Sequence, residues 1–299
     1  MRVGNNPNRS QKVRHIPGVV VAAITHLPNT EGYHAERQNV IKASLETMRA
    51  NAGRDCGIMI WDNGSCTGFV DWLREVYRPD WLVLSWNMGK SSARASMARM
   101  MPSGTVLGVA DDDILYYPDW LVKQMKILQT YPNVGTVSGW PVRTQFRFHT
   151  SATVQWGKKE GRAKIEHGRF ISDEEEKDFC RSIGRDWKWH KNYSVNDEDI
   201  RLTFKGVQAY ATGHHCQWIG YVDRLKDLVL FDNEAMADER IFERAINDAG
   251  LLRLTTCERT TRHIGNVLEY KVEEVWQNTE RNSYISAVAN SCMECLPKT

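Results

Sequence analysis

GTVLGVADDDILYYPDW, from Gly104 to Trp120, joins a short apolar run directly to three consecutive carboxylates and a turn. The run from Thr105 to Ala110 predicts a buried β-strand, because it is short, rich in valine and preceded by a glycine. The segment from Pro118 to Thr130 predicts a helix, because proline is tolerated in a first helical turn. The three aspartates therefore lie where the strand ends and the chain turns toward the helix.

Asp111, Asp112 and Asp113 repel one another and are costly to desolvate, so folding alone does not favour them at a strand end. A hard divalent cation removes that cost, because carboxylate oxygens and substrate phosphates are the usual ligands of Mg2+ and Mn2+. The alternative is a solvated acidic turn in which Asp111 caps the following helix. From these three residues alone, both interpretations stay open.

The composition is that of an ordinary globular protein, with 299 residues of which 41% are hydrophobic and 25% charged. A formal net charge of +2 does not indicate a general nucleic-acid binder. The first 18 residues are polar and basic with no apolar segment behind the charges, so no secretory signal is expected. The longest apolar run, around Val19 to Ile24, is too short to span a bilayer. A cytoplasmic location is the resulting expectation.

The seven cysteines are irregularly spaced, which is typical of a reducing compartment rather than a disulfide framework. Cys292 and Cys295 form a CxxC pair, but a tetrahedral zinc site needs a second pair. Cys216 and Cys257 are poor candidates for that second pair. Whether the CxxC pair binds a metal stays open.

Strands alternate with helices along the first 140 residues, which predicts a mainly parallel sheet covered by helices on both faces. The expected strands are 18–25, 56–61, 81–86, 105–110 and 134–138, and the expected helices are 33–50, 67–77, 91–101 and 118–130. Ligands of such sheets bind beyond the carboxyl ends of the strands, where the loops gather. Polar side chains predicted at these ends are Thr25, His26, Asp62, Asn87, Lys90 and Asp111 to Asp113. One cleft is expected to collect them.

From residue 141 the α/β alternation stops, and residues 143–205 interleave basic and aromatic side chains, as from Trp187 to Lys191. Such a mixture suits a binding surface for a sugar or an anionic acceptor, and ordinary surface packing is the alternative. The acidic run from Asp173 to Glu176 is typical of a solvated helix face. Strands are expected again at 206–213 and 251–256, with a helix at 232–250 closed by Gly250.

Several motifs follow one another along the chain. VVVAAIT forms the first strand, WDNGS follows the second, NMGKSSAR follows the third, and ADDD is followed by PDWL. Three further motifs come later in the chain: ATGHHCQWIG, DERIFERAINDAG and RHIGN. In this order the motifs resemble those of the nucleotide-sugar-dependent glycosyltransferases of family 2, which have the Rossmann-like GT-A fold.

The resemblance covers residues 18–140 and 206–266 and implies one GT-A domain. Residues 18–140 would form its nucleotide-sugar-binding half, and residues 206–266 its acceptor and catalytic half. Residues 141–205 would be a variable, irregular insertion on the acceptor side. Residues 1–17 would form an N-terminal arm and residues 267–299 a C-terminal helical tail.

The resemblance assigns nucleotide-sugar contacts to the residues at the strand ends, which are Thr25, His26, Asp62, Asn87, Lys90, Arg94, Asp111 and Asp112. Within this set, Thr25 and Asp62 are expected on the base and ribose side. Asp113 is expected to be the direct ligand of Mn2+ or Mg2+, and Asp111 the motif aspartate nearer the ribose and metal. His263 is expected to complete the metal or diphosphate site. The implied donor is a nucleotide sugar, most simply a UDP-sugar.

The helix within DERIFERAINDAG supplies the general base in the family, usually as Glu followed by Asp. This chain has Asp238 followed by Glu239, and counting back from Ala249-Gly250 places Glu239 at the base position. The reversed order leaves Asp238 as the alternative. A carboxylate that takes the proton of an acceptor hydroxyl adds about 10² to 10⁴ in rate, and a single displacement of this kind inverts the anomeric centre.

Two other functions stay open. A nucleotidyltransferase that makes nucleotide sugars usually has a glycine-rich, basic loop after its first strand, and residues 27–33 lack one. A non-catalytic carbohydrate-binding protein on the same fold would bind sugars without nucleotide or metal. For a transferase, the acceptor stays open among a glycan, a protein and another hydroxyl compound, and so does the oligomeric state.

Overall fold

The computed structural model describes residues 10, 16, 18–161, 163–229 and 240–268. Its strands are β1 (Val19–Thr25), β2 (Gly57–Asn63), β3 (Trp81–Ser85), β4 (Val106–Ala110), β5 (Ile114–Tyr116), β6 (Val134–Ser138), β7 (Lys164–Gly168), β8 (Asp199–Phe204), β9 (Val207–Tyr210), β10 (Gln217–Tyr221), β11 (Leu252–Thr255) and β12 (Thr261–His263). Its α-helices are α1 (Arg37–Ala52), α2 (Thr67–Trp72), α3 (Lys90–Met100), α4 (Trp120–Thr130), α5 (Ser151–Glu160), α6 (Asp173–Ser182), α7 (Trp187–Tyr193), α8 (Val222–Leu225) and α9 (Arg240–Asp248). Shorter turns are η1 (Gly32–His34), η2 (Leu73–Tyr77) and η3 (Arg143–Arg147).

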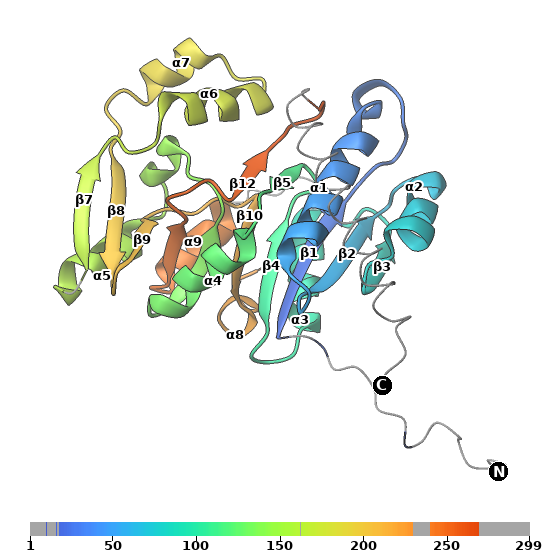
Figure 1. The fold of residues 1–299 in the computed structure, drawn as a ribbon, viewed down its shortest axis with the longest axis horizontal. Helices are drawn as coiled ribbons and strands as arrows, with labels where there is room; N and C mark the ends of the chain where they lie inside the picture. The colour runs from blue at the N-terminus through green and yellow to red at the C-terminus, as the bar shows by residue number, and fades with distance from the viewer. Residues whose placement is uncertain (1–9, 11–15, 17, 162, 230–239, 269–299) are drawn as a thin grey trace, which may run out of the picture.

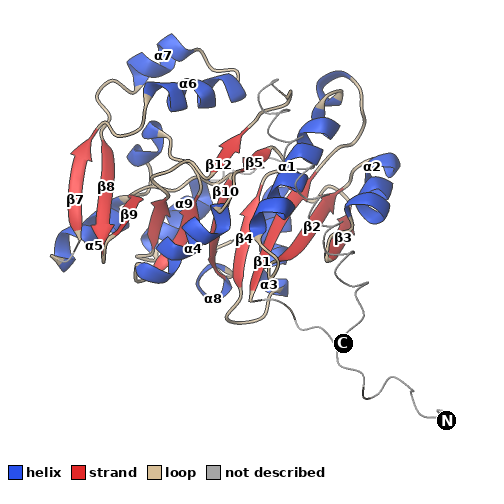
Figure 2. Ribbon diagram, viewed as in Figure 1, coloured by secondary structure: helices blue, strands red, loops and turns tan. Residues whose placement is uncertain are grey.

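A ten-stranded sheet crosses the described part of the chain in the order β3-β2-β1-β4-β10-β6-β11-β9-β8-β7 (Figures 1 and 2). The strands β3, β2, β1 and β4 are parallel, as is the pair β6 and β11. The strand β10 runs antiparallel between β4 and β6, and β9, β8 and β7 continue with antiparallel pairs. The predicted α/β fold is confirmed, with its parallel character concentrated in the first half of the chain.

Helices cover both faces of the sheet, as predicted. On one face, Ile41 of α1 and Trp120 of α4 pack with Val21 of β1 in a large apolar core. On the other face, Met97 of α3 and Ile246 of α9 join a second core formed by alternate residues of the same strands. Because parallel strands are buried on both faces, β1 is an almost continuous apolar run rather than an alternating one.

Residues 141–205 hold more regular structure than their sequence indicated. The antiparallel pair β7 and β8 extends the sheet at one edge, and α6 and α7 lie together beside the end of the sheet (Figure 1). The strand β7 escaped prediction because its side chains are half-buried or exposed and show no apolar alternation. Helix α6 begins with a capping box in which Ser172 and Glu175 bond reciprocally, a local signal that the sequence contains.

The acidic run of α6 is not wholly solvated, which corrects the expectation for Glu176. The Glu176 side chain is buried, and its Oε2 lies 2.6 Å from Nε2 of the buried His190 of α7. The backbone N–H of Arg143 donates to Oε1 of Glu176 at 2.9 Å. The Arg143 guanidinium in turn pairs with the buried Asp199 at 3.0 Å. These buried ionic groups tie α6, α7, η3 and β8 to one another.

Some predictions fall outside the described residues. They concern the N-terminal arm apart from residues 10 and 16, the start of the predicted 232–250 helix with Asp238 and Glu239, and the tail beyond residue 268 with Cys292 and Cys295. Among the residues that the structure does describe, no helix combines the length and the apolar character needed to cross a membrane.

Candidate active site

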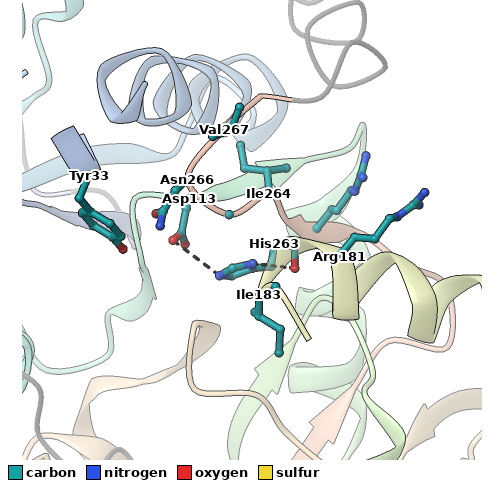
Figure 3. A pocket seen from close by; sticks show the side chains of 12 residues that line it. Tyr33, Asp113, Arg181, Ile183, His263, Ile264, Asn266 and Val267 are labelled. Carbon is teal, nitrogen blue, oxygen red and sulfur yellow. Dashed lines mark hydrogen bonds and ion pairs between the residues drawn. The ribbon is translucent and has the colours of Figure 1, made fainter. Parts of the chain in front are cut away.

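A small two-stranded sheet brings the aspartate run to the late histidine. The strand β5 follows the aspartates directly and pairs antiparallel with β12, which places His263 opposite Ile114. The backbone N–H of Ile264 donates to the carbonyl oxygen of Asp113 at 2.9 Å. As a result, Nε2 of His263 lies 3.6 Å from Oδ2 of Asp113, as Figure 3 shows. These are the two residues for which the resemblance implied a shared metal site.

The contacts of the Asp113 carboxylate among the described residues are made by one oxygen, Oδ2. Its Oδ1 atom is buried and has no hydrogen-bond partner among the described residues. A buried carboxylate oxygen without a partner is costly, so a ligand at this position stabilises the site. Carboxylate oxygens suit Mg2+ and Mn2+, whereas an imidazole nitrogen favours a transition metal. Asp113 and His263 together therefore fit Mn2+ better than Mg2+.

Asp111 is held by two cations from the start of α3. Nζ of Lys90 donates to Oδ2 of Asp111 at 2.8 Å, and Nη2 of Arg94 donates to Oδ1 at 2.8 Å. The Lys90 side chain is 27% exposed and that of Arg94 only 3%, so Lys90 is the cation that reaches solvent. The structure thus brings together three predicted nucleotide contacts, Lys90, Arg94 and Asp111.

Asp112 is engaged within the protein on both of its oxygens. Its Oδ1 accepts a hydrogen bond from Nη2 of Arg37, and its Oδ2 accepts one from the backbone N–H of His26 at 3.2 Å. Burial raises the pKa of Asp112 above its usual range, although the positive charge of Arg37 acts in the opposite direction. This geometry makes Asp112 an anchor for Arg37 and for the loop after β1. The contact of Asp112 with a nucleotide stays a prediction.

Arg37, on the first turn of α1, was not among the predicted site residues. Besides Asp112, its guanidinium contacts Oδ2 of Asp113 at 3.3 Å and donates to Oδ1 of Asn266 at 3.1 Å. Burial lowers the pKa of Arg37, but the two carboxylates outweigh burial and hold the pKa above its usual value. An arginine near a helix start carries no local sign of such burial, so sequence reasoning had no signal for it.

The ends of β1 and β2 are joined by side-chain hydrogen bonds. Oγ1 of Thr25 donates to Oδ2 of Asp62 at 3.0 Å, and the backbone N–H of Ser65 donates to Oδ1 of Asp62 at 3.0 Å. Nδ1 of His26 lies 3.0 Å from the carbonyl oxygen of Asn63. Thr25 and Asp62 are both buried. The predicted residues meet at one end of the sheet, and their contact with a nucleotide stays a prediction.

Asn63 links this group to the end of β3. Its Nδ2 donates to Oδ1 of Asn87 at 3.0 Å, and its Oδ1 accepts a hydrogen bond from the backbone N–H of Met88 at 2.9 Å. The backbone N–H of Gly89 also donates to Oδ1 of Asn87, at 3.1 Å. Asn87 therefore shapes the turn that leads to Lys90, and Asn63 is a further residue of this network that sequence reasoning missed.

A pocket of about 540 Å³ opens beside Asp113 and His263 (Figure 3). This volume lies within the usual range of small-molecule sites. Its lining comes from four separate parts of the chain: Tyr33, Asp113, the segment 181–184 at the end of α6, and the segment 262–267 that begins within β12. The end of α6 belongs to the region 141–205, so part of this region borders the candidate metal site.

The predicted general bases, Asp238 and Glu239, lie outside the described residues. Helix α9 starts at the next residue, Arg240. Its Glu243 is buried, with Oε1 at 2.8 Å from Nη2 of Arg253 on β11 and at 3.2 Å from Nδ1 of His215. Helix α9 is thus fixed to the sheet and to the GHHC loop that precedes β10.

Comparison with known proteins places these features in a family. The model of the family described as glycosyl transferase family 2 matches residues 33–190, which is more than half of the chain of 299 residues. A search of the curated proteins found no match.

Solved structures that are similar to this chain include the following two. The mannosyltransferase PcManGT from Pyrobaculum calidifontis, in complex with GDP-Man and Mn2+, is 23% identical over 46% of this chain and 41% of that chain, with a TM-score of 0.35. GalNAc-T7 with UDP, GalNAc and Mn2+ is 12% identical over 83% of this chain and 43% of that chain, with a TM-score of 0.48. This chain thus spans less than half of either protein. The family match confirms the resemblance seen in the sequence motifs, and the chain belongs to glycosyl transferase family 2.

Proposed function

We propose that this chain is a metal-dependent transferase that moves a sugar from a nucleoside diphosphate sugar to an acceptor hydroxyl with inversion. The observation that carries the proposal is the placement of Asp113 beside His263, with a buried carboxylate oxygen of Asp113 that has no partner among the described residues. A solvated acidic turn would not bury such an oxygen next to an imidazole. Family membership supports sugar transfer as the reaction.

Each residue at the strand ends has a task in this proposal. Asp113 and His263 hold the divalent cation, for which Mn2+ is the best fit. When bound, the cation offsets the negative charge that develops on the departing nucleoside diphosphate. Asp111 lies nearer the ribose, and Lys90 adds a positive charge that reaches solvent. Thr25 and Asp62 lie on the side of the base.

The chemical step is a single displacement. The acceptor oxygen forms a bond to the anomeric carbon while the bond from that carbon to the diphosphate oxygen breaks, and the acceptor proton passes to a carboxylate. We assign that carboxylate to Glu239, with Asp238 as the alternative. Because the acceptor attacks from the side opposite the leaving group, the anomeric configuration is inverted. We assign the acceptor side to residues 141–205, whose helix α6 borders the pocket.

A UDP-sugar is the donor that we propose. Calorimetric titration with UDP and with GDP, each in Mn2+ and in EDTA, tests this assignment and the metal together. We expect micromolar binding of UDP in Mn2+ that is lost in EDTA. Preference for GDP would change the donor class but keep the reaction. Absence of binding for both nucleotides, with retained binding of free saccharides, would replace the transferase proposal with the carbohydrate-binding one.

A further inference from the structure

The hydroxyl group of Ser182, the last residue of α6, connects this helix to His263. Oγ of Ser182 donates a hydrogen bond to the carbonyl oxygen of Phe179 at 2.8 Å. The same Oγ lies 2.9 Å from Nδ1 of His263. The other ring nitrogen of His263, Nε2, faces Asp113. One hydroxyl therefore lies between a helix carbonyl and the histidine of the candidate metal site.

These two contacts favour one tautomer of a neutral His263. A serine hydroxyl has one hydrogen, and a carbonyl oxygen can only accept, so the hydrogen of Ser182 is directed to Phe179. Oγ of Ser182 is then an acceptor toward His263, and Nδ1 of His263 must be the donor. In a neutral imidazole with Nδ1 protonated, Nε2 keeps its lone pair. That lone pair is directed toward Asp113.

The facing atoms of His263 and Asp113 are too far apart for a direct hydrogen bond. The 3.6 Å between Nε2 of His263 and Oδ2 of Asp113 exceeds the usual length of a hydrogen bond. The two candidate ligands therefore make no direct hydrogen bond, and Oδ1 of Asp113 is the oxygen that has no partner among the described residues.

Packing restricts movement of the histidine and the serine. The ring of His263 has two aromatic neighbours, Trp140 and Phe179, whose ring centroids each lie 6.4 Å from that of His263. Gly265 has φ of +71°, and a Cβ atom at this position would lie 2.3 Å from the carbonyl oxygen of Ser182. The loop after β12 thus rests directly on the backbone of Ser182, so the end of α6 and the histidine loop form one unit.

We propose that Ser182 is a positioning residue for the metal site. By accepting a hydrogen bond from Nδ1 of His263, it fixes the tautomer in which Nε2 can bind the divalent cation. The inference rests on the proposed function, because it takes Asp113 and His263 as the ligands. It also gives a part of the region 141–205 a task in metal binding.

Two measurements on a set of variants test this role. Ser182→Ala removes the acceptor and Ser182→Thr keeps it. Thr130→Ala is the matched control, because Thr130 is the half-buried last residue of α4 and its Oγ1 donates to the carbonyl oxygen of Lys126. Long-range proton–nitrogen NMR of histidine-labelled protein reports the tautomer of His263 without metal. We expect the Nδ1-protonated form in the unsubstituted chain, in Ser182→Thr and in Thr130→Ala, and its loss in Ser182→Ala.

The second measurement is the affinity for Mn2+, followed by the electron paramagnetic resonance of free Mn2+ with and without UDP. Ser182→Ala should weaken Mn2+ binding about 10- to 100-fold, the usual effect of removing a group that orients a ligand. Ser182→Thr should restore the affinity for Mn2+. In a His263→Ala background, Ser182→Ala should not lower this affinity further.

An Nε2-protonated His263 in the unsubstituted chain, or unchanged Mn2+ affinity in Ser182→Ala, would overturn the inference. Unchanged Mn2+ affinity in His263→Ala would instead overturn the metal site of the proposed function, and the NMR result would still decide the tautomer.

Discussion

Nη1 of Arg37 lies 3.3 Å from Oδ2 of Asp113, the same carboxylate oxygen that faces His263. The other Asp113 oxygen, Oδ1, has no partner among the described residues. Arg37 therefore orients the carboxylate and also supplies positive charge for Asp112. The aspartate run is stable at a strand end because Lys90 and Arg94 hold its first member and Arg37 holds the next two.

Arg37→Ala should destabilise the protein, because it leaves the buried Asp112 without its ionic partner. Removal of one member of a buried ion pair costs about 3–5 kcal/mol in the free energy of unfolding. Urea denaturation followed by circular dichroism measures this cost. The double variant Arg37→Met with Asp112→Asn should lose less stability, since residue 112 is then neutral and only Asp113 loses its contact with Arg37. Equal losses in the single and the double variant would show that packing, not charge, explains the effect.

Asp113→Ala and His263→Ala should each remove the part of nucleotide binding that is sensitive to EDTA. Both variants take away a ligand of the proposed cation while β5 and β12 keep their backbone pairing. Calorimetric titration with UDP and Mn2+ measures the effect. Asp223→Ala is the control, because Asp223 caps the 103–104 turn through Ser103 and Gly104. If Asp113→Ala bound UDP and Mn2+ normally, the metal site would have to lie elsewhere.

The strands and helices of the first 140 residues were predictable. Their apolar runs and helical periods are long enough to indicate each element from its own residues alone. The strand β1 and helices α1 and α4 were found within a few residues of their ends. Strands β5 and β10 were missed. The three residues of β5, Ile114–Tyr116, are too few to show a hydrophobic period, and the β10 sequence QWIGY does not alternate between apolar and polar residues.

The site residues that could be predicted from the sequence are those that lie within a sequence motif. Asp111, Asp113 and His263 belong to motifs that resemble those of the family, and the structure brings Asp113 and His263 together. Arg37 and Ser182 belong to no such motif. Their roles depend on contacts with residues far along the chain, which composition and spacing do not report.

Gly265→Ala should cost more stability than Gly250→Ala, although both glycines have φ of +71°. The backbone strain is therefore matched, at about 1 kcal/mol for alanine in this conformation. A side chain at position 250 would meet no heavy atom within 4 Å, whereas one at position 265 would meet the carbonyl oxygen of Ser182 at 2.3 Å. Gly265→Ala should also weaken Mn2+ binding, because it displaces the loop from α6. Equal urea midpoints for the two variants would contradict this steric argument.

The thiol of Cys56 should be almost unreactive toward iodoacetamide in the folded protein. Burial raises the pKa of Cys56 to about 12, so its thiolate is scarce below that pH. The pKa of the unfolded chain is about 8.5, so raising the pH from there toward 12 favours the unfolded state. Peptide mass spectrometry should show Cys66, which is half-buried, modified before Cys56 at pH 8. Equal modification rates for the two thiols in folded protein would contradict the burial of Cys56.

Glu239→Gln should reduce sugar transfer by about 10² to 10⁴ while leaving the binding of UDP and Mn2+ unchanged. The amide keeps the size of the side chain but cannot take the acceptor proton, so only the chemical step is affected. Asp238→Asn is the matched variant at the neighbouring carboxylate, and it should retain most of the activity. Single-turnover transfer and calorimetric binding, measured on the same preparations, separate the effect on the chemical step from the effect on binding.

Full activity in Glu239→Gln with loss in Asp238→Asn would move the base to Asp238, since the sequence reverses the family's usual order of these two acids. Loss of activity in both variants, with binding intact, would mean that the two carboxylates act together on the acceptor.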